Sequence, residues 1–261
     1  MTIHSSADGH ASAGLADGHA SAGFSDGHAS AGFGIKPSGD GAARCGARDI
    51  GAGCGAGCAV AGDPSGRRIV LVHANSSEAR AWTRLLRAVP AGQEWVSVAR
   101  PDPGPTTAAA LRPLLTLRRA RKPLLVGCGT GVSVALRAAL DFPDLVGGLL
   151  LVDPTGGEAA RPSVLRRIAA RLMPPAVRST AEELQSMGPL LASIRVPVTL
   201  VQGKDEPPGL LGTPFLEQAL SGCRNLTVVT VPGVHVQPAK HEPAVRTALA
   251  ALVAAVERGG A

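Results

Sequence analysis

The sequence predicts an α/β protein with a doubly wound, mostly parallel sheet. Short apolar runs recur along the chain after residue 66, and stretches with helical periodicity separate them. The runs are apolar throughout instead of alternating with polar residues, which is typical of strands covered by helices on both faces. A glycine-rich turn at 127–131 joins one run directly to a helical stretch, as in strand-turn-helix units.

Each element follows from its local pattern. The predicted strands are residues 68–73, 95–99, 123–126, 146–152, 196–201 and 226–231. The predicted helices are residues 77–89, 106–119, 132–140 and 243–256, and the last one has a proline at its start. Turn residues at 101–105, Pro-Asp-Pro-Gly-Pro, separate the second strand from the second helix.

An insert of about residues 156–195 separates the fourth and fifth predicted strands. Leu165, Ile168 and Leu172 share one face of a predicted helix, and Pro174-Pro175 ends it. The segment 179–182, Ser-Thr-Ala-Glu, resembles a capping box that opens another helix. We expect this insert to lie over the carboxyl ends of the strands, where open α/β sheets bind ligands.

Residues 1–66 differ in composition from the rest of the chain. The string Asp-Gly-His-Ala-Ser-Ala-Gly begins at Asp8, again at Asp17 and a third time at Asp26. Small residues dominate, so little apolar surface is available to offset the entropy of ordering, and we predict a disordered tail. Its histidines and cysteines permit a metal-sequestering role, but their spacing does not match a structural zinc site.

Composition restricts the possible functions. The chain has 261 residues, a formal charge of +6, 2% aromatic residues and no tyrosine. Because stacking aromatics are scarce and no reader module is recognisable, we expect no nucleic-acid partner. No apolar stretch is long enough to span a bilayer, and no secretory signal is recognisable, so we expect no membrane role. Five cysteines in such a chain suggest free thiols in the reducing cytoplasm.

The segment Gly127-Cys128-Gly129-Thr130-Gly131 carries most of the functional information. A tight glycine turn between a buried strand and a helix is the setting of the nucleophile elbow, G-x-S-x-G. Here Gly129 holds the central position and supplies no nucleophile. A phosphate or dinucleotide loop is the alternative interpretation, but the spacing does not match G-x-G-x-x-G, and the chain contains no Gly-Lys-Ser or Gly-Lys-Thr.

Several segments in order resemble the α/β-hydrolase superfamily, in particular its esterase, lyase and dehalogenase-like members, across residues 67–257. The resemblance rests on Val70–Asn75, the elbow, Leu149–Pro154, Leu200–Pro207 and Val231–His235. It implies the α/β-hydrolase fold with a short helical cap. It also implies that the loop in Leu200–Pro207 carries the triad acid and that the loop in Val231–His235 carries the triad histidine. Both loops follow the elbow, which is the chain order of that superfamily.

The resemblance assigns candidate site residues. His235 corresponds to the triad histidine, and either Glu206 or Asp205 to the triad acid. Asn75 and Thr130 stand where the oxyanion-hole N–H groups are expected. His73 and Asp153 are interpreted as structural residues.

Three functions are compatible with these residues. The first is a degenerate hydrolase that lacks the serine nucleophile and binds a small ligand or a protein partner. The second is a working hydrolase or lyase on a small ester-like substrate, using His235 as general base or Cys128 after a local rearrangement. The third is a tail-driven metal or interaction protein. The resemblance implies no cofactor and no metal in the folded domain, and leaves the oligomeric state open.

Overall fold

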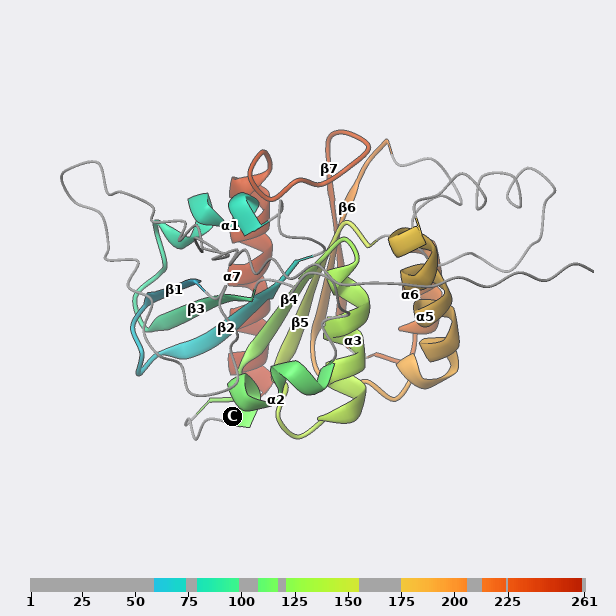
Figure 1. Ribbon diagram of the computed structural model, residues 1–261, viewed down its shortest axis with the longest axis horizontal. Coiled ribbons are helices and arrows are strands. Elements are labelled where there is room, and N and C mark those ends of the chain that lie inside the picture. Colours follow the sequence, from blue (N-terminus) through green and yellow to red (C-terminus); the bar gives the residue numbers. More distant parts are fainter. Residues whose placement is uncertain are drawn as a thin grey trace, which may run out of the picture. The chain divides into compact units, whose positions relative to one another are not determined.

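A sheet in the order β1-β3-β2-β4-β5-β6-β7 forms the centre of the computed structural model (Figure 1). The strands are β1 Ala59–Gly62, β2 Arg67–Val72, β3 Gln93–Val98, β4 Leu124–Cys128, β5 Gly148–Val152, β6 Val198–Gly203 and β7 Leu226–Val231. The structure describes residues 59–73, 79–98, 108–116, 121–154, 175–205, 213–223 and 225–259. The predicted tail repeats, the turn at 101–105 and the first cap helix lie outside these ranges.

Strand pairing confirms the predicted mostly parallel sheet. β1 runs antiparallel to β3, and every other neighbouring pair is parallel. The chain passes from β2 to β3 on one side and then crosses to β4 on the other side of β2, so the strand order reverses at this point. In doubly wound sheets, ligands bind beyond the carboxyl ends of the strands at such a reversal.

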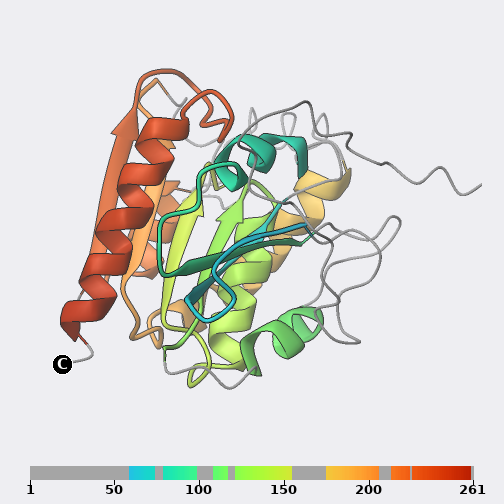
Figure 2. The same cartoon turned by 90° about the vertical axis from the view of Figure 1, so that its left-hand side faces the viewer.

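Helices cover both faces of the sheet. They are α1 Ala79–Leu86, α2 Ala108–Thr116, α3 Gly131–Asp141, α5 Pro175–Leu191, α6 Thr213–Ala219 and α7 Glu242–Gly259. Helices α1 and α7 lie on one face, and α2, α3, α5 and α6 lie on the other (Figure 1). Figure 2 shows α7 lying along the sheet, where it packs on β5 and β6.

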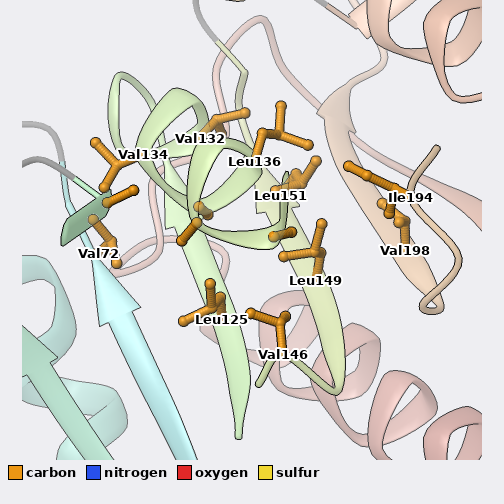
Figure 3. Packing of buried hydrophobic residues seen from close by; sticks show 14 of the residues in the cluster. Val72, Leu125, Val132, Val134, Leu136, Val146, Leu149, Leu151, Ile194 and Val198 are labelled. Carbon is orange, nitrogen blue, oxygen red and sulfur yellow. The ribbon is translucent and has the colours of Figure 1, made fainter. Parts of the chain in front are cut away.

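Two apolar layers fill the space between the sheet and its helices. On the α3 face, Leu125 and Leu149 of the strands pack with Val132 and Leu136 of α3, and all four are completely buried (Figure 3). On the α7 face, Trp82 of α1 and the apolar side of α7 pack against strand side chains, which include Trp95 of β3. Burying each such side chain contributes about 1.5–3 kcal/mol, so the low aromatic content does not prevent a continuous core.

The amino-terminal edge of the sheet differs from the sequence prediction. Strand β1 lies within the segment 1–66 that the sequence assigns to the tail. It pairs with β3, and Val60 and Ala61 are buried against the sheet. Only four residues long, β1 is too short for a period-2 pattern to be visible in the sequence.

The second half of the predicted cap is also different. Helix α5 begins at Pro175, before the capping-box pattern at 179–182, which lies inside the helix. Its Leu184, Met187 and Leu191 are buried in the same cluster as the apolar side chains of α3, so α5 covers a sheet face. It does not lie over the carboxyl ends of the strands as we expected for the insert. Proline is common at the first helical position because its missing N–H has no partner there.

Candidate active site

Gly129 occupies the tip of the turn between β4 and α3. Its φ of 56° lies in the left-handed region, which glycine reaches without the steric penalty of a Cβ. Its N–H donates to the carbonyl of Val152 at 3.0 Å, and its own carbonyl accepts from the N–H of Val132 at 3.2 Å. These bonds hold the turn at the carboxyl edge of the sheet, between β4 and β5.

The flanking glycines are needed for close backbone packing. A Cβ on Gly127 would lie 2.7 Å from the carbonyl oxygen of Gly131, and a Cβ on Gly131 would lie 2.4 Å from that of Val72. Real Cβ atoms do not approach so closely, so a side chain at either position would push the helix away from the strands. The pattern Gly-x-Gly-x-Gly therefore follows from the strand-turn-helix geometry, and a phosphate ligand is not needed to explain it.

A histidine and a carboxylate face each other at the same edge of the sheet. Asp153 directly follows β5, and His235 lies in the loop between β7 and α7. The Nδ1 atom of His235 is 3.3 Å from Oδ2 of Asp153. Strand β5 neighbours β4, with Cys128 and Val152 in register, so Asp153 stands beside Gly129 at the ends of adjacent strands.

The surroundings of Asp153 are unfavourable for a carboxylate. Its φ of 49° is the one positive value among the described residues other than glycine. Its side chain is 13% exposed, and Oδ1 is buried with no hydrogen-bond partner among the described residues. Burial raises the pKa of Asp153, while a hydrogen bond from the backbone N–H of Val236 and the proximity of His235 and His241 act in the opposite direction. His235 is about half exposed, so a ligand can reach its ring.

Of the two residues predicted as the triad acid, the structure describes Asp205. Asp205 accepts a hydrogen bond from the N–H of Gly233 at 3.1 Å through Oδ2, and its own N–H donates to the Gly233 carbonyl. It thus ties the end of β6 to the loop that carries His235, while Asp153 contacts the His235 ring. Glu206 lies outside the described residues. One sequence signal points to Asp153 as a site residue. It directly follows β5, the buried strand that neighbours the elbow strand β4.

The remaining candidates have different surroundings. Cys128 is 5% exposed and belongs to the apolar cluster on the α7 face, so its thiol is packed in the core. His73 is buried, with Nε2 2.9 Å from Oγ of Ser97 on β3, which agrees with a structural role. Thr130 is buried at the N-cap of α3, directly after Gly129. Asn75 lies outside the described residues.

Within the described part of the chain, no group of three or more His, Cys, Asp or Glu side chains could hold a metal ion. In the same ranges, no helix combines the length and the hydropathy of a membrane-spanning segment.

Solved structures with a similar arrangement identify the fold. A candidate lipase from Acinetobacter baumannii superposes with a TM-score of 0.59 at 14% identity, over 77% of this chain and 88% of that one. The chain has the α/β-hydrolase fold. A monoacylglycerol lipase from Paleococcus ferrophilus matches 76% of this chain and 98% of its own length at 17% identity, with a TM-score of 0.54.

A carboxylesterase from Bacillus subtilis shows the same α/β-hydrolase similarity, with a TM-score of 0.53 at 15% identity over 75% of this chain and 86% of that one. No family model and no curated protein matches the sequence. The match to solved structures therefore establishes the α/β-hydrolase fold.

Proposed function

We propose that this chain is a degenerate α/β-hydrolase that does not form a covalent acyl-enzyme and binds a small ligand at the elbow. The glycine at the tip of the turn carries the proposal. Covalent acyl transfer requires a nucleophile beside the histidine, and Gly129 has no side chain to provide one. The neighbouring thiol, that of Cys128, is buried in the core.

The chemistry at the elbow favours a ligand with a carbonyl or ester oxygen. The N-terminus of α3 begins at Gly131, and helix N-termini attract partial negative charge because their first N–H groups point outward. The half-exposed ring of His235 provides a hydrogen-bonding group at the same sheet edge. The similar structures include proteins named as lipases and a carboxylesterase, which supports an ester-like ligand.

Binding of uncleavable ester analogues tests the proposal. We expect short-chain methyl ketones, which resemble esters but have no leaving group, to raise the melting temperature of the protein in a saturable way. The variant His235→Ala should lose this response, whereas Lys240→Ala, which removes an exposed side chain from the same loop, should keep it. Equal responses of both variants, or no saturable shift with any ketone, would contradict a ligand site at the elbow.

The contact between His235 and Asp153 favours a second function, hydrolysis by general-base catalysis. In this scheme Asp153 accepts a hydrogen bond from Nδ1–H of His235, which leaves Nε2 unprotonated to remove a proton from water. The resulting hydroxide attacks the ester carbonyl, the alcohol leaves after taking up a proton, and no covalent enzyme intermediate forms. General-base catalysis alone gives about 10²–10⁴-fold acceleration.

Kinetics distinguish this second function from simple binding. General-base hydrolysis should show no burst of product, because no acyl-enzyme accumulates. We expect His235→Ala and Asp153→Asn to abolish such turnover, while Asp205→Asn retains most of it. Turnover that survives in His235→Ala and in Asp153→Asn would exclude the His235–Asp153 pair as the general base.

A further inference from the structure

A cavity of about 680 Å³ lies at the amino-terminal edge of the sheet, the edge opposite Gly129. Its walls come from the starts of β2, β5, β6 and β7, from the turn before β4 and from the end of α7. The polar residues in the lining are Arg67, Arg121, Lys122, Arg195, Asn225 and Glu257. Because these groups are far along the strands from the elbow, the cavity is separate from the candidate active site.

The cavity carries an excess of positive charge. Four basic side chains line it, and Glu257 is the one acidic residue among the lining residues. The Glu257 carboxylate is 3.8 Å from Nη2 of Arg67 and 3.6 Å from Nη1 of Arg121, and the side chain is 48% exposed. At these distances, one solvated carboxylate shared by two guanidinium groups compensates only a small part of their charge.

Arg67 is the buried member of this group. Its side chain is 6% exposed, and its Nε atom is buried with no hydrogen-bond partner among the described residues. Its Nη1 donates to the Lys122 carbonyl at 3.4 Å, near the limit for a hydrogen bond. Burial lowers the pKa of Arg67, Glu257 raises it, and nearby Arg121 lowers it further. A buried guanidinium is costly when its partners are this distant, so an anion bound beside it would stabilise it.

The rest of the cavity suggests the size and character of its ligand. Val146, Val196 and Pro197 form apolar walls next to the basic groups. A Cβ on Gly147 would lie 3.0 Å from the Lys122 carbonyl oxygen, so glycine allows the turn before β4 to pack closely against β5. Arginine and lysine together bind phosphate oxygens well, since guanidinium offers paired donors and ammonium a compact charge.

A second cavity of about 300 Å³, between β3 and α7, is a weaker candidate. It contains Arg246, but this guanidinium already donates to the carbonyls of Leu85 and Ala88 and pairs with Glu242. Its charge is therefore compensated within the protein.

We propose that the basic cavity at the amino-terminal edge of the sheet is a second ligand site, which binds a phosphate-bearing small molecule between Arg67, Arg121, Lys122 and Arg195. The phosphate contacts the basic side chains, and the organic part of the molecule lies against the apolar walls. This site does not depend on the proposed function at the elbow.

Calorimetric titration of the full chain with inorganic pyrophosphate tests the site. We expect saturable binding that weakens as salt is added, because exposed charges are screened. Arg121→Gln should weaken binding about tenfold through the loss of one charge-assisted hydrogen bond. Glu257→Gln should strengthen it about threefold, because it removes the competing carboxylate. Both side chains are about half exposed or more, so the variants should fold.

Lys240→Gln is the matched control, because it removes one exposed positive charge from the loop near His235. It should leave the affinity for pyrophosphate unchanged. An equal loss in Arg121→Gln and Lys240→Gln would show attraction to net charge alone and overturn the proposal. Binding of duplex DNA or acidic vesicles without binding of pyrophosphate would also overturn it, in favour of a surface for macromolecular anions.

Discussion

Asp153 combines features that each reduce stability. A positive φ at a residue with a Cβ costs on the order of 1–3 kcal/mol, and a buried polar oxygen without a partner adds a similar amount. Such strain is typical of functional sites, where the surrounding structure keeps a residue in an unfavourable state. The strain at Asp153 and its contact with His235 therefore support the role proposed for the pair in ligand binding or proton transfer.

Replacing Asp153 by asparagine should stabilise the protein while it removes the function of the pair. Asparagine tolerates the left-handed conformation and carries no charge to desolvate. We expect a gain of about 1 kcal/mol at neutral pH, or about 3 °C in melting temperature. Asp205→Asn is the control, and its hydrogen bond to the Gly233 N–H predicts no gain. Thermal unfolding of both variants measures this difference.

The pH dependence of this gain has a defined sign. Burial raises the pKa of Asp153 in the folded state above its unfolded value of about 3.9, so folding favours the protonated carboxyl. The wild type should therefore lose stability, relative to Asp153→Asn, as the pH rises through this elevated pKa. Below the unfolded pKa the two proteins should differ little. A difference that shrinks as the pH rises would contradict the desolvated environment.

At this scale the glycine turn and the histidine loop can be recognised in the sequence, whereas the contact between His235 and Asp153 cannot. Gly129 and His235 follow recognisable patterns of glycine and apolar residues. Asp153 and Asp205 each follow the end of a strand within two residues. No local sequence pattern shows which of the two carboxylates contacts the histidine. Which carboxylate reaches the ring depends on how the loop of His235 folds back over β5, and Asp205 is occupied by the Gly233 backbone.

At the scale of elements, the end of β6 supports the loop that carries His235. A Cβ on Gly203 would lie 2.4 Å from the Gly233 carbonyl oxygen and 2.5 Å from that of Val234. These atoms are backbone and cannot rotate away. The histidine loop therefore rests directly on β6, and its position follows from the sheet.

Gly203→Ala should consequently displace the histidine loop. We expect a loss of about 2 kcal/mol, typical of overpacking in a rigid site, together with loss of the ligand response at the elbow. Gly222→Ala is the matched control, because its nearest neighbour, the Ala192 carbonyl oxygen, lies at 3.4 Å. That change should stay within about 0.5 kcal/mol. Unfolding in urea gives both values, and similar losses in the two variants would contradict direct support of the loop.

Strands and long helices were predicted well at this scale because their apolar runs and periodicity are strong local signals. Helix α5 was misplaced because the capping-box pattern at 179–182 resembles a helix start, whereas the helix begins at Pro175. The seven-residue α6 was not predicted, since it is shorter than the window in which helical periodicity becomes visible.

For the whole molecule, the mostly parallel pairing and the covering of both faces follow from the alternation of strands and helices. Strand β1 could not be predicted from the sequence, because it forms by pairing with β3 and has no recognisable pattern of its own. The folded unit therefore begins at least as early as Ala59, although the composition changes visibly only near residue 66.

Two truncations test this boundary. Removal of residues 1–57 leaves every described element intact, and we expect the melting temperature to change by no more than about 1 °C. Removal of residues 1–65 also deletes β1 with buried Val60, and it should cost about 2 kcal/mol, or about 5 °C. Equal melting temperatures for the two truncated proteins would show that β1 does not contribute to the core.

The central proposal is that the elbow has no nucleophile and that the His235–Asp153 pair stands beside it. Intact-mass measurement after exposure to a serine-directed phosphonate tests this most directly, with the wild type and the variants Gly129→Ser and Gly129→Ala side by side. We predict no adduct on the wild type or on Gly129→Ala, and a single adduct on Gly129→Ser that Asp153→Asn suppresses. An adduct on the wild type, or a folded Gly129→Ser protein that stays unlabelled, would contradict the account.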